Sequence, residues 1–176
     1  MEIDVSPGLG VLSVLRYLDY RPWFALAEFV DNSIESFNQN RDWLGEKLTV
    51  EIDIQTDSIT IKDDAAGIFA DEYERAFRTA SPPPSTQGLS EFGMGMKSAA
   101  CWFGSRFQVR STAIGEDVVR DVNFDIQSII DSQTPLITVD IQPVNDSRSH
   151  GTQVTLLDLH SEIRGRTIGK IKDHLG

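Results

Sequence analysis

Cysteine, basic residues and long apolar runs are all scarce in this chain of 176 residues. The single cysteine, Cys101, lies in an apolar helical pattern, which excludes a disulfide framework and a cysteine-rich zinc site. Sixteen basic residues against 27 acidic ones give a formal net charge of -11, so a large nucleic-acid footprint is not indicated. No apolar run approaches membrane-spanning length, and the acidic start MEIDVSPGLG lacks a signal-peptide profile. These absences predict a cytoplasmic protein (nuclear if eukaryotic) that does not contact a membrane.

Two well-known phosphate-binding motifs and the usual histidine spacings are missing as well. A P-loop requires Gly-Lys followed by Ser or Thr, but Met94 occupies the lysine position after Gly88 and Gly93. A dinucleotide fingerprint requires a third glycine at Ser98 and a preceding strand, where this chain has a proline-rich segment. The three histidines fit neither a metal site nor a catalytic triad.

The length and the hydrophobic fraction of 40% suit one well-buried globular domain. Helical patterns cover residues 9–18, 21–40, 70–80, 91–104 and 161–176. Alternating apolar and polar residues predict strands at 47–55, 58–63, 105–113, 116–124, 135–144 and 151–159. Helices followed by strands with one central helix indicate an α+β fold, with helices on one face of a mixed or antiparallel sheet.

The segment AEFVDNSIES is the first of three that carry side chains suited to chemistry. Glu28 and Asn32 are four residues apart in it, so they share one face of the predicted helix. Taken alone, both could be ordinary solvent-facing polar residues.

The second segment, KDDAAGI, follows a predicted strand that ends at Asp63. A carboxylate at a strand end can accept a hydrogen bond from a ligand amine, and the small residues before Gly67 leave room for a flat ring. The alternative is an acidic turn that caps a hairpin.

The third segment is the glycine-rich turn GMGMKS, which opens a predicted helix at Gly93. Glycines before a helix let the backbone approach an anion, and the helix N-terminus offers unpaired N–H groups. Lys97 adds a cation near the same place. The alternative is a loop that only lets the helix pack closely on the sheet.

The order of these segments resembles that of the GHKL ATPases, the superfamily of gyrase, the ATP-driven heat-shock chaperone, sensor histidine kinases and MutL. The pattern is E-x-x-x-N on a helix, D-x-x-x-G after a strand, a loop, G-x-G-x-K, and a late strand that begins Gly151-Thr152. It spans about Ala25 to Leu157, and its three segments are most similar to the microrchidia (MORC) ATPases and related prokaryotic proteins. The resemblance implies a Bergerat fold, a two-layer α/β sandwich with helices on one face of a mixed, largely antiparallel sheet.

The resemblance also implies roles for residues of the acidic helix. Asn32 would ligate a Mg²⁺ ion that bridges the phosphates of ATP, and Glu28 would orient and activate the attacking water. Glu35 would line the same helix face. Histidine kinases usually carry asparagine in place of Glu28, so a glutamate there favours hydrolysis over phosphotransfer.

By the same resemblance, the other two segments and the late strand would contact the nucleotide. Asp63 would accept a hydrogen bond from the adenine amine, Gly67 would shape the base pocket, and Thr152 would lie near both, acting through water. The phosphates would be held by the backbone amides of Gly93, Met94, Gly95, Met96 and Lys97.

Two residues depart from the family pattern. Ala65 stands where the family often has glycine, which is acceptable if its φ is negative. Ser90 replaces a glycine that commonly opens the phosphate motif. Residues 1–176 are expected to form one GHKL ATP-binding domain, with a strap or helix at 1–20, an ATP lid at 79–92 and no following transducer domain.

The resemblance predicts an ATPase that binds ATP and ADP, depends on Mg²⁺, and couples hydrolysis to a change of shape or to homodimerisation. Turnover is expected to be slow in isolation, because many relatives complete the site with a cation from the transducer domain. Three alternatives are an ATP-gated binding module without useful hydrolysis, a histidine-kinase catalytic domain and a purely structural α+β domain. Glu28 and the lack of a phosphoacceptor helix disfavour the second, and four ordered motifs disfavour the third.

Overall fold

The structure is a computed structural model that describes residues 10–77, 95–134, 136–144 and 149–176. Three sets of predicted features lie outside the described residues. They are Gly93 and Met94, the lid at 79–92, and positions 1–9 of the N-terminal strap.

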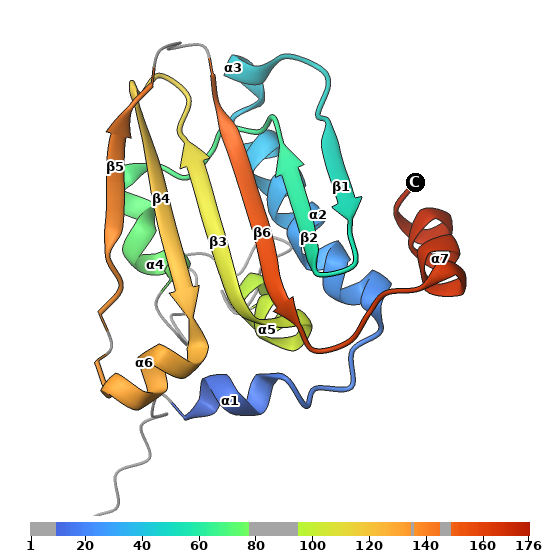
Figure 1. The fold of residues 1–176 in the computed structure, drawn as a ribbon. Helices are drawn as coiled ribbons and strands as arrows, with labels where there is room; N and C mark the ends of the chain where they lie inside the picture. The colour runs from blue at the N-terminus through green and yellow to red at the C-terminus, as the bar shows by residue number, and fades with distance from the viewer. Residues whose placement is uncertain (1–9, 78–94, 135, 145–148) are drawn as a thin grey trace, which may run out of the picture.

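Six strands form one sheet, and each neighbouring pair in it is antiparallel (Figure 1). The strands are β1 (Val50–Ile54), β2 (Ser58–Asp63), β3 (Gly104–Thr112), β4 (Val118–Asp125), β5 (Val139–Pro143) and β6 (Gly151–Leu159). Their order is β1-β2-β6-β3-β4-β5, so β6 lies between β2 and β3. The predicted α+β class is confirmed, and the described strands contain no parallel pair.

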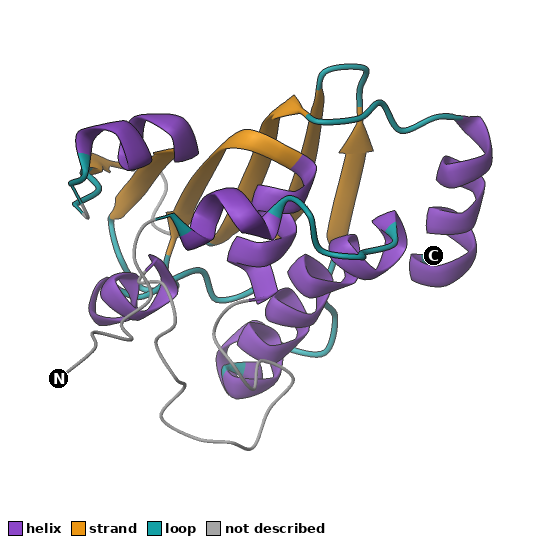
Figure 2. Ribbon diagram, turned by 90° about the horizontal axis from the view of Figure 1, so that it is seen from below, coloured by secondary structure: helices purple, strands orange, loops and turns teal. Residues whose placement is uncertain are grey.

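Helices cover one side of this sheet, and others lie at its edge and ends (Figures 1 and 2). They are α1 (Val11–Leu15), α2 (Pro22–Gln39), α3 (Arg41–Leu44), α4 (Tyr73–Phe77), α5 (Gly95–Phe103), α6 (Ile126–Ser132) and α7 (Gly165–Leu175), with a 3₁₀ turn, η1 (Ala70–Glu72), before α4. α2, α4 and α5 lie behind the sheet in Figure 1, and α7 stands beside the beginning of α2. Among the described residues, no helix is both long and apolar enough to cross a lipid bilayer.

Two rows of buried apolar side chains cross the four central strands. One row contains Ile59, Leu156, Phe107 and Phe124, and the next contains Ile61, Val154, Val109 and Val122. Strand residues alternate between faces, so these positions all point to the same side of the sheet. The helical layer meets them with Ala25, Leu26 and Phe29 of α2 and Ala99, Ala100 and Phe103 of α5. Burying each large apolar side chain contributes about 1.5–3 kcal/mol, so this core fixes the helices on the sheet.

The pairing of β2 with β6 brings two distant segments together. Lys62 pairs with Gln153, so the end of β2 at Asp63 meets the beginning of β6 at Thr152. Pro22 occupies the first turn of α2, where a missing N–H has no cost, and this helix of 18 residues crosses behind the sheet towards this end (Figure 1). The acidic helix and the Asp63 turn therefore face one another.

Candidate functional site

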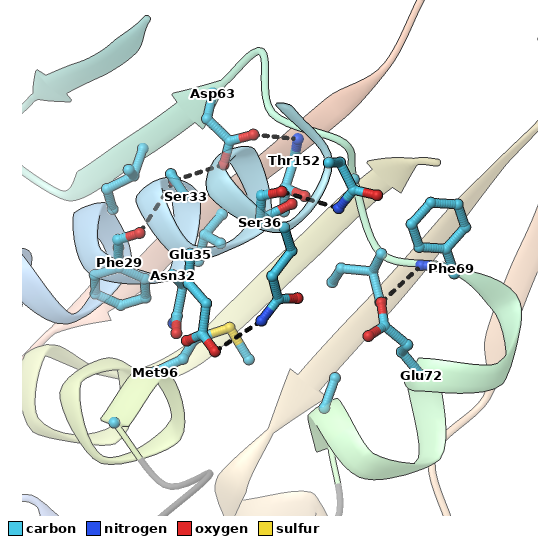
Figure 3. Close-up of a pocket in the computed structure, with 18 of the residues that line it drawn as sticks. Phe29, Asn32, Ser33, Glu35, Ser36, Asp63, Phe69, Glu72, Met96 and Thr152 are labelled. Atoms are coloured by element: carbon cyan, nitrogen blue, oxygen red, sulfur yellow. Dashed lines mark hydrogen bonds between the residues drawn. The ribbon is translucent and has the colours of Figure 1, made fainter. Parts of the chain in front are cut away.

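A cavity of about 500 Å³ lies between α2 and the ends of β2 and β6 (Figure 3). The turn after β2, the η1–α4 segment and the first turn of α5 form its other walls. Predicted site residues that line it are Asn32, Asp63, Gly67, Gly95, Met96 and Thr152. Asp63 and Thr152 lie at one end, and Met96 and Glu72 lie at the opposite end.

Asp63 is a half-buried carboxylate that already accepts three hydrogen bonds from the protein. Its Oδ1 accepts from the N–H groups of Ala65, at 3.0 Å, and Thr152, at 3.1 Å. Its Oδ2 accepts from the Ser33 hydroxyl at 2.8 Å. Burial raises the pKa of Asp63, and the three hydrogen bonds oppose that rise. Since a carboxylate has about four acceptor positions, Oδ2 can accept one more hydrogen bond from a donor in the cavity.

The turn after β2 brings the backbone against the wall of the cavity. Gly67 has a φ of +76°, and a Cβ at this position would lie 2.1 Å from the carbonyl oxygen of Thr112. Both the conformation and the space therefore require glycine. Ala65 is not among the described non-glycine residues with positive φ, so alanine fits its place in the turn.

A buried hydroxyl behind the cavity ties this turn to the beginning of β6. Ser111 Oγ accepts from the N–H of Ile68 at 2.9 Å and donates to the carbonyl oxygen of Gly151 at 3.1 Å. Thr152 Oγ1 lies 3.0 Å from Ser111 Oγ, close enough to donate to it. Ser111 is 1% exposed, so its bonds have no competition from water. The wall that carries Thr152 is therefore held in place before any ligand binds.

At the other end, α2 presents Asn32 and Glu28 towards the beginning of α5. Asn32 lines the cavity, and its side-chain amide has no hydrogen-bond partner within the described residues. Glu28 does not line the cavity but packs on Gly95, where a Cβ would lie 2.0 Å from Glu28 Oε2. Burial, followed by the charge of Asp31, raises the pKa of Glu28. A carboxylate of raised pKa is a stronger proton acceptor once it is ionised.

The side chain of Lys97 lies outside the cavity. Its Nζ donates to the carbonyl oxygen of Ala76, near the end of α4, at 3.0 Å. The side chain is 1% exposed, and burial, followed by the charge of Arg75, lowers the pKa of Lys97 to about 8. Its ammonium group is thus directed to α4 and not into the cavity.

Several important residues of the site are absent from the sequence predictions. Ser33 orients Asp63, and the only signal for it is its position directly after Asn32 on the same helix. Glu72 and Arg75 line the cavity from the η1–α4 segment, where Arg75 donates to Glu72 at 3.0 Å. Their spacing of three predicts an ion pair on a helix but does not indicate that the pair faces a cavity.

Comparison with known families gives one match. A family model described as "Histidine kinase-, DNA gyrase B-, and HSP90-like ATPase" matches residues 20–152, which is more than half of the chain and includes Glu28, Asp63, Gly95 and Thr152. A comparison with curated protein sequences finds no match.

Proposed function

Because the chain belongs to the family of histidine kinase-, DNA gyrase B- and HSP90-like ATPases, which implies ATP binding, we propose that its cavity binds ATP with Mg²⁺ and hydrolyses it. The observation that carries the proposal is the hydrogen bonding of the Asp63 carboxylate. Three protein donors hold this carboxylate at one end of the cavity, which leaves one acceptor position of Oδ2 for a ligand. The exocyclic amine of adenine is a donor of the required kind.

The residues at the opposite end fit a magnesium ion. Mg²⁺ prefers oxygen ligands and is commonly held by one or two side chains together with substrate phosphates. Asn32 offers an amide oxygen that has no partner in the described part of the chain, and Glu35 lines the same cavity. Among the described residues, no cluster of three or more His, Cys, Asp or Glu side chains could hold a metal ion alone. Bound Mg²⁺ would neutralise charge on the phosphates, with Asn32 as its protein ligand.

Hydrolysis requires a base for the attacking water, and Glu28 is the candidate. It lies on the same helix face as Asn32, one turn earlier, and rests against Gly95 at the beginning of α5. Its raised pKa favours proton acceptance, and its carboxylate would receive the proton of water. The N-terminal turn of α5 would contribute backbone amides, of Gly95, Met96 and Lys97, to the phosphates.

Three finer parts of the proposal come from the resemblance of the three sequence segments. They are the microrchidia-like subgroup, coupling of ATP to a change of shape, and ATP-dependent homodimerisation. Location in the cytoplasm or nucleus is proposed from the composition of the sequence. Analytical ultracentrifugation with ATP and with ADP tests the homodimerisation, since a sedimentation coefficient independent of the nucleotide would exclude it.

A second function, ATP-gated binding without useful hydrolysis, is favoured by one observation. Glu28 is not among the residues that line the cavity, so its carboxylate must reach the water from beside Gly95. Phosphate release by the wild type and by Glu28→Gln separates the two functions. Loss of turnover with retained ATP affinity supports the hydrolase, whereas equal rates in both proteins support the binding module.

Calorimetric titration of ATP, with and without Mg²⁺, tests the binding site itself. Asp63→Asn places a donor where Asp63 now only accepts, so it should abolish ATP binding. Asn32→Ala should remove the effect of Mg²⁺ on affinity. Asp64→Asn is the matched control, because Asp64 accepts a hydrogen bond from Thr49 N–H outside the cavity, at 2.7 Å, and asparagine can do the same. Equal ATP affinities for Asp63→Asn and Asp64→Asn would exclude the proposed site.

A further inference from the structure

We propose that Arg75 binds the polyphosphate chain of the nucleotide, and that Glu72 holds Arg75 until the nucleotide displaces it. This inference rests on the proposed function, because it assigns a new ligand-binding residue to the same cavity. Arg75 belongs to none of the segments that resemble the family motifs.

Arg75 differs in charge from the other described residues of the cavity wall. Among the described residues that line the cavity, it is the only cation, and three carboxylates, Glu35, Asp63 and Glu72, line the same cavity. ATP brings several negative charges into this space. Lys97, in the first turn of α5, directs its ammonium group to the carbonyl oxygen of Ala76. A phosphate chain in the cavity therefore has Arg75 as its side-chain counter-charge within the described part of the protein.

Arg75 lies at the end of the cavity where the phosphates would be. If adenine binds at Asp63, the rest of the nucleotide extends towards Met96 and Glu72, which Figure 3 shows at the opposite end. Arg75 donates to Glu72 there, and the next residue, Ala76, binds Lys97 of the first turn of α5. The guanidinium group is thus close to the turn proposed to bind phosphate.

The bond between Arg75 and Glu72 is suited to exchange. The two side chains are 43% and 35% exposed, and ion pairs with this exposure are weak because water screens them. Glu72 also accepts from the N–H of Phe69 at 3.4 Å through its other oxygen, so it keeps one partner when Arg75 leaves. Arginine can bind phosphate through two parallel N–H groups, which is stronger than a single exposed ion pair.

Opposite responses of the two partners follow from this exchange. Arg75→Gln removes a phosphate ligand, so ATP affinity should fall about tenfold. Glu72→Gln removes the competitor and a negative charge, so ATP affinity should rise roughly threefold. Adenosine, which has no phosphate, should bind equally to the wild type and both variants. A purely structural ion pair predicts instead that both substitutions weaken binding alike.

The experiment is calorimetric titration of the wild type and both variants with ATP, ADP and adenosine, with Arg75→Lys as a charge-preserving variant. Thermal unfolding should show the same small loss for Arg75→Gln and Glu72→Gln, since each breaks the same exposed pair. Arg75→Lys should retain part of the ATP affinity.

Equal losses of ATP and adenosine affinity in Arg75→Gln, or weaker ATP binding by Glu72→Gln, would overturn the assignment. If ATP binds the wild type and depends on Asp63 but not on Arg75, only this inference fails; if the wild type binds no ATP, the proposed function fails with it.

Discussion

The two ends of the cavity are built in different ways. At the Asp63 end, the carboxylate accepts three hydrogen bonds, and a buried hydroxyl fixes the wall beside it. At the Gly95 end, the side chains of Asn32 and Glu28 have no hydrogen-bond partner among the described residues. The first end is preorganised for one donor group, whereas the second depends on the nucleotide and its metal for partners.

This difference separates the consequences of substitution. Changes at the Asp63 end disturb backbone and buried hydrogen bonds, so they should alter folding and affinity together. Changes at the Gly95 end affect side chains that have no hydrogen-bond partner among the described residues, so they should alter turnover with little effect on folding. Glycine provides the clearest test, because both ends contain one that cannot carry a side chain without contact.

Gly67→Ala should have the largest effect. The new Cβ would meet the Thr112 carbonyl oxygen at 2.1 Å, and the φ of +76° is strained for alanine, so we expect a loss of about 3 kcal/mol in stability and no measurable ATP binding. Gly45→Ala is the control, because its φ is +83° and no atom lies within 4 Å of the added Cβ. It should lose only about 1 kcal/mol and keep full ATP affinity. Chemical denaturation and titration with ATP measure both, and equal losses in the two variants would contradict the comparison.

Gly95→Ala should have the next largest effect, and on turnover rather than folding. Its Cβ would lie 2.0 Å from Glu28 Oε2, which is the far end of a flexible side chain and can move. Misplacing a catalytic group by about 1 Å commonly costs about 100-fold in rate, so phosphate release should fall by that factor. Gly169→Ala, in α7 with nothing near its Cβ, is the matched control and should leave turnover unchanged. Full activity in Gly95→Ala would show that Glu28 takes no part in ATP hydrolysis.

Lys97→Met tests the buried charge of Lys97, near the Gly95 end of the cavity, through the pH dependence of stability. The pKa of Lys97 is lowered from its ordinary value of 10.5 to about 8, so the folded protein binds fewer protons than the unfolded chain between these values. The wild type should therefore gain of order 2 kcal/mol of stability as pH rises from 8 to 10, and lose it as pH falls again. Lys97→Met should lack this gain. Urea denaturation at several pH values measures the difference between the two proteins, and parallel pH curves would show that Lys97 titrates normally.

The sequence patterns predict most of the fold but not its strand order. The alternation of apolar residues predicts all six strands, and Pro22 predicts the beginning of α2. The place of β6 between β2 and β3 is a long-range pairing that no local pattern encodes. α6 is absent from the predictions because it is short, although Asp125, which accepts from Ser128 N–H at 2.9 Å, is a recognisable N-cap.

The same limit applies to the site. The family resemblance identifies Asn32, Asp63 and Thr152 as candidate binding residues, and the fold places them around one cavity. The structural role of Ser111 could not be predicted, because it depends on the pairing of β3 with β6 and on the hydrogen bond from Ile68 N–H. Motifs therefore identify groups that would touch the ligand, while the residues that position those groups are found only from tertiary contacts.

Ser33→Ala should have the smallest effect and tests how much of the preorganisation comes from one hydroxyl. The Ser33 hydroxyl donates to Asp63 Oδ2 at 2.8 Å and lies 3.1 Å from the Phe29 carbonyl oxygen. Its removal leaves Asp63 with two backbone donors, so the carboxylate should keep its place while its pKa rises further. Losing one such bond is worth about 1 kcal/mol, so ATP affinity should fall roughly fivefold. The control is Ser36→Ala, because Ser36 lies one turn later on the cavity wall and is not bonded to Asp63. It should change ATP affinity less than Ser33→Ala does. Equal losses of affinity in the two variants would mean that backbone donors alone hold the Asp63 end.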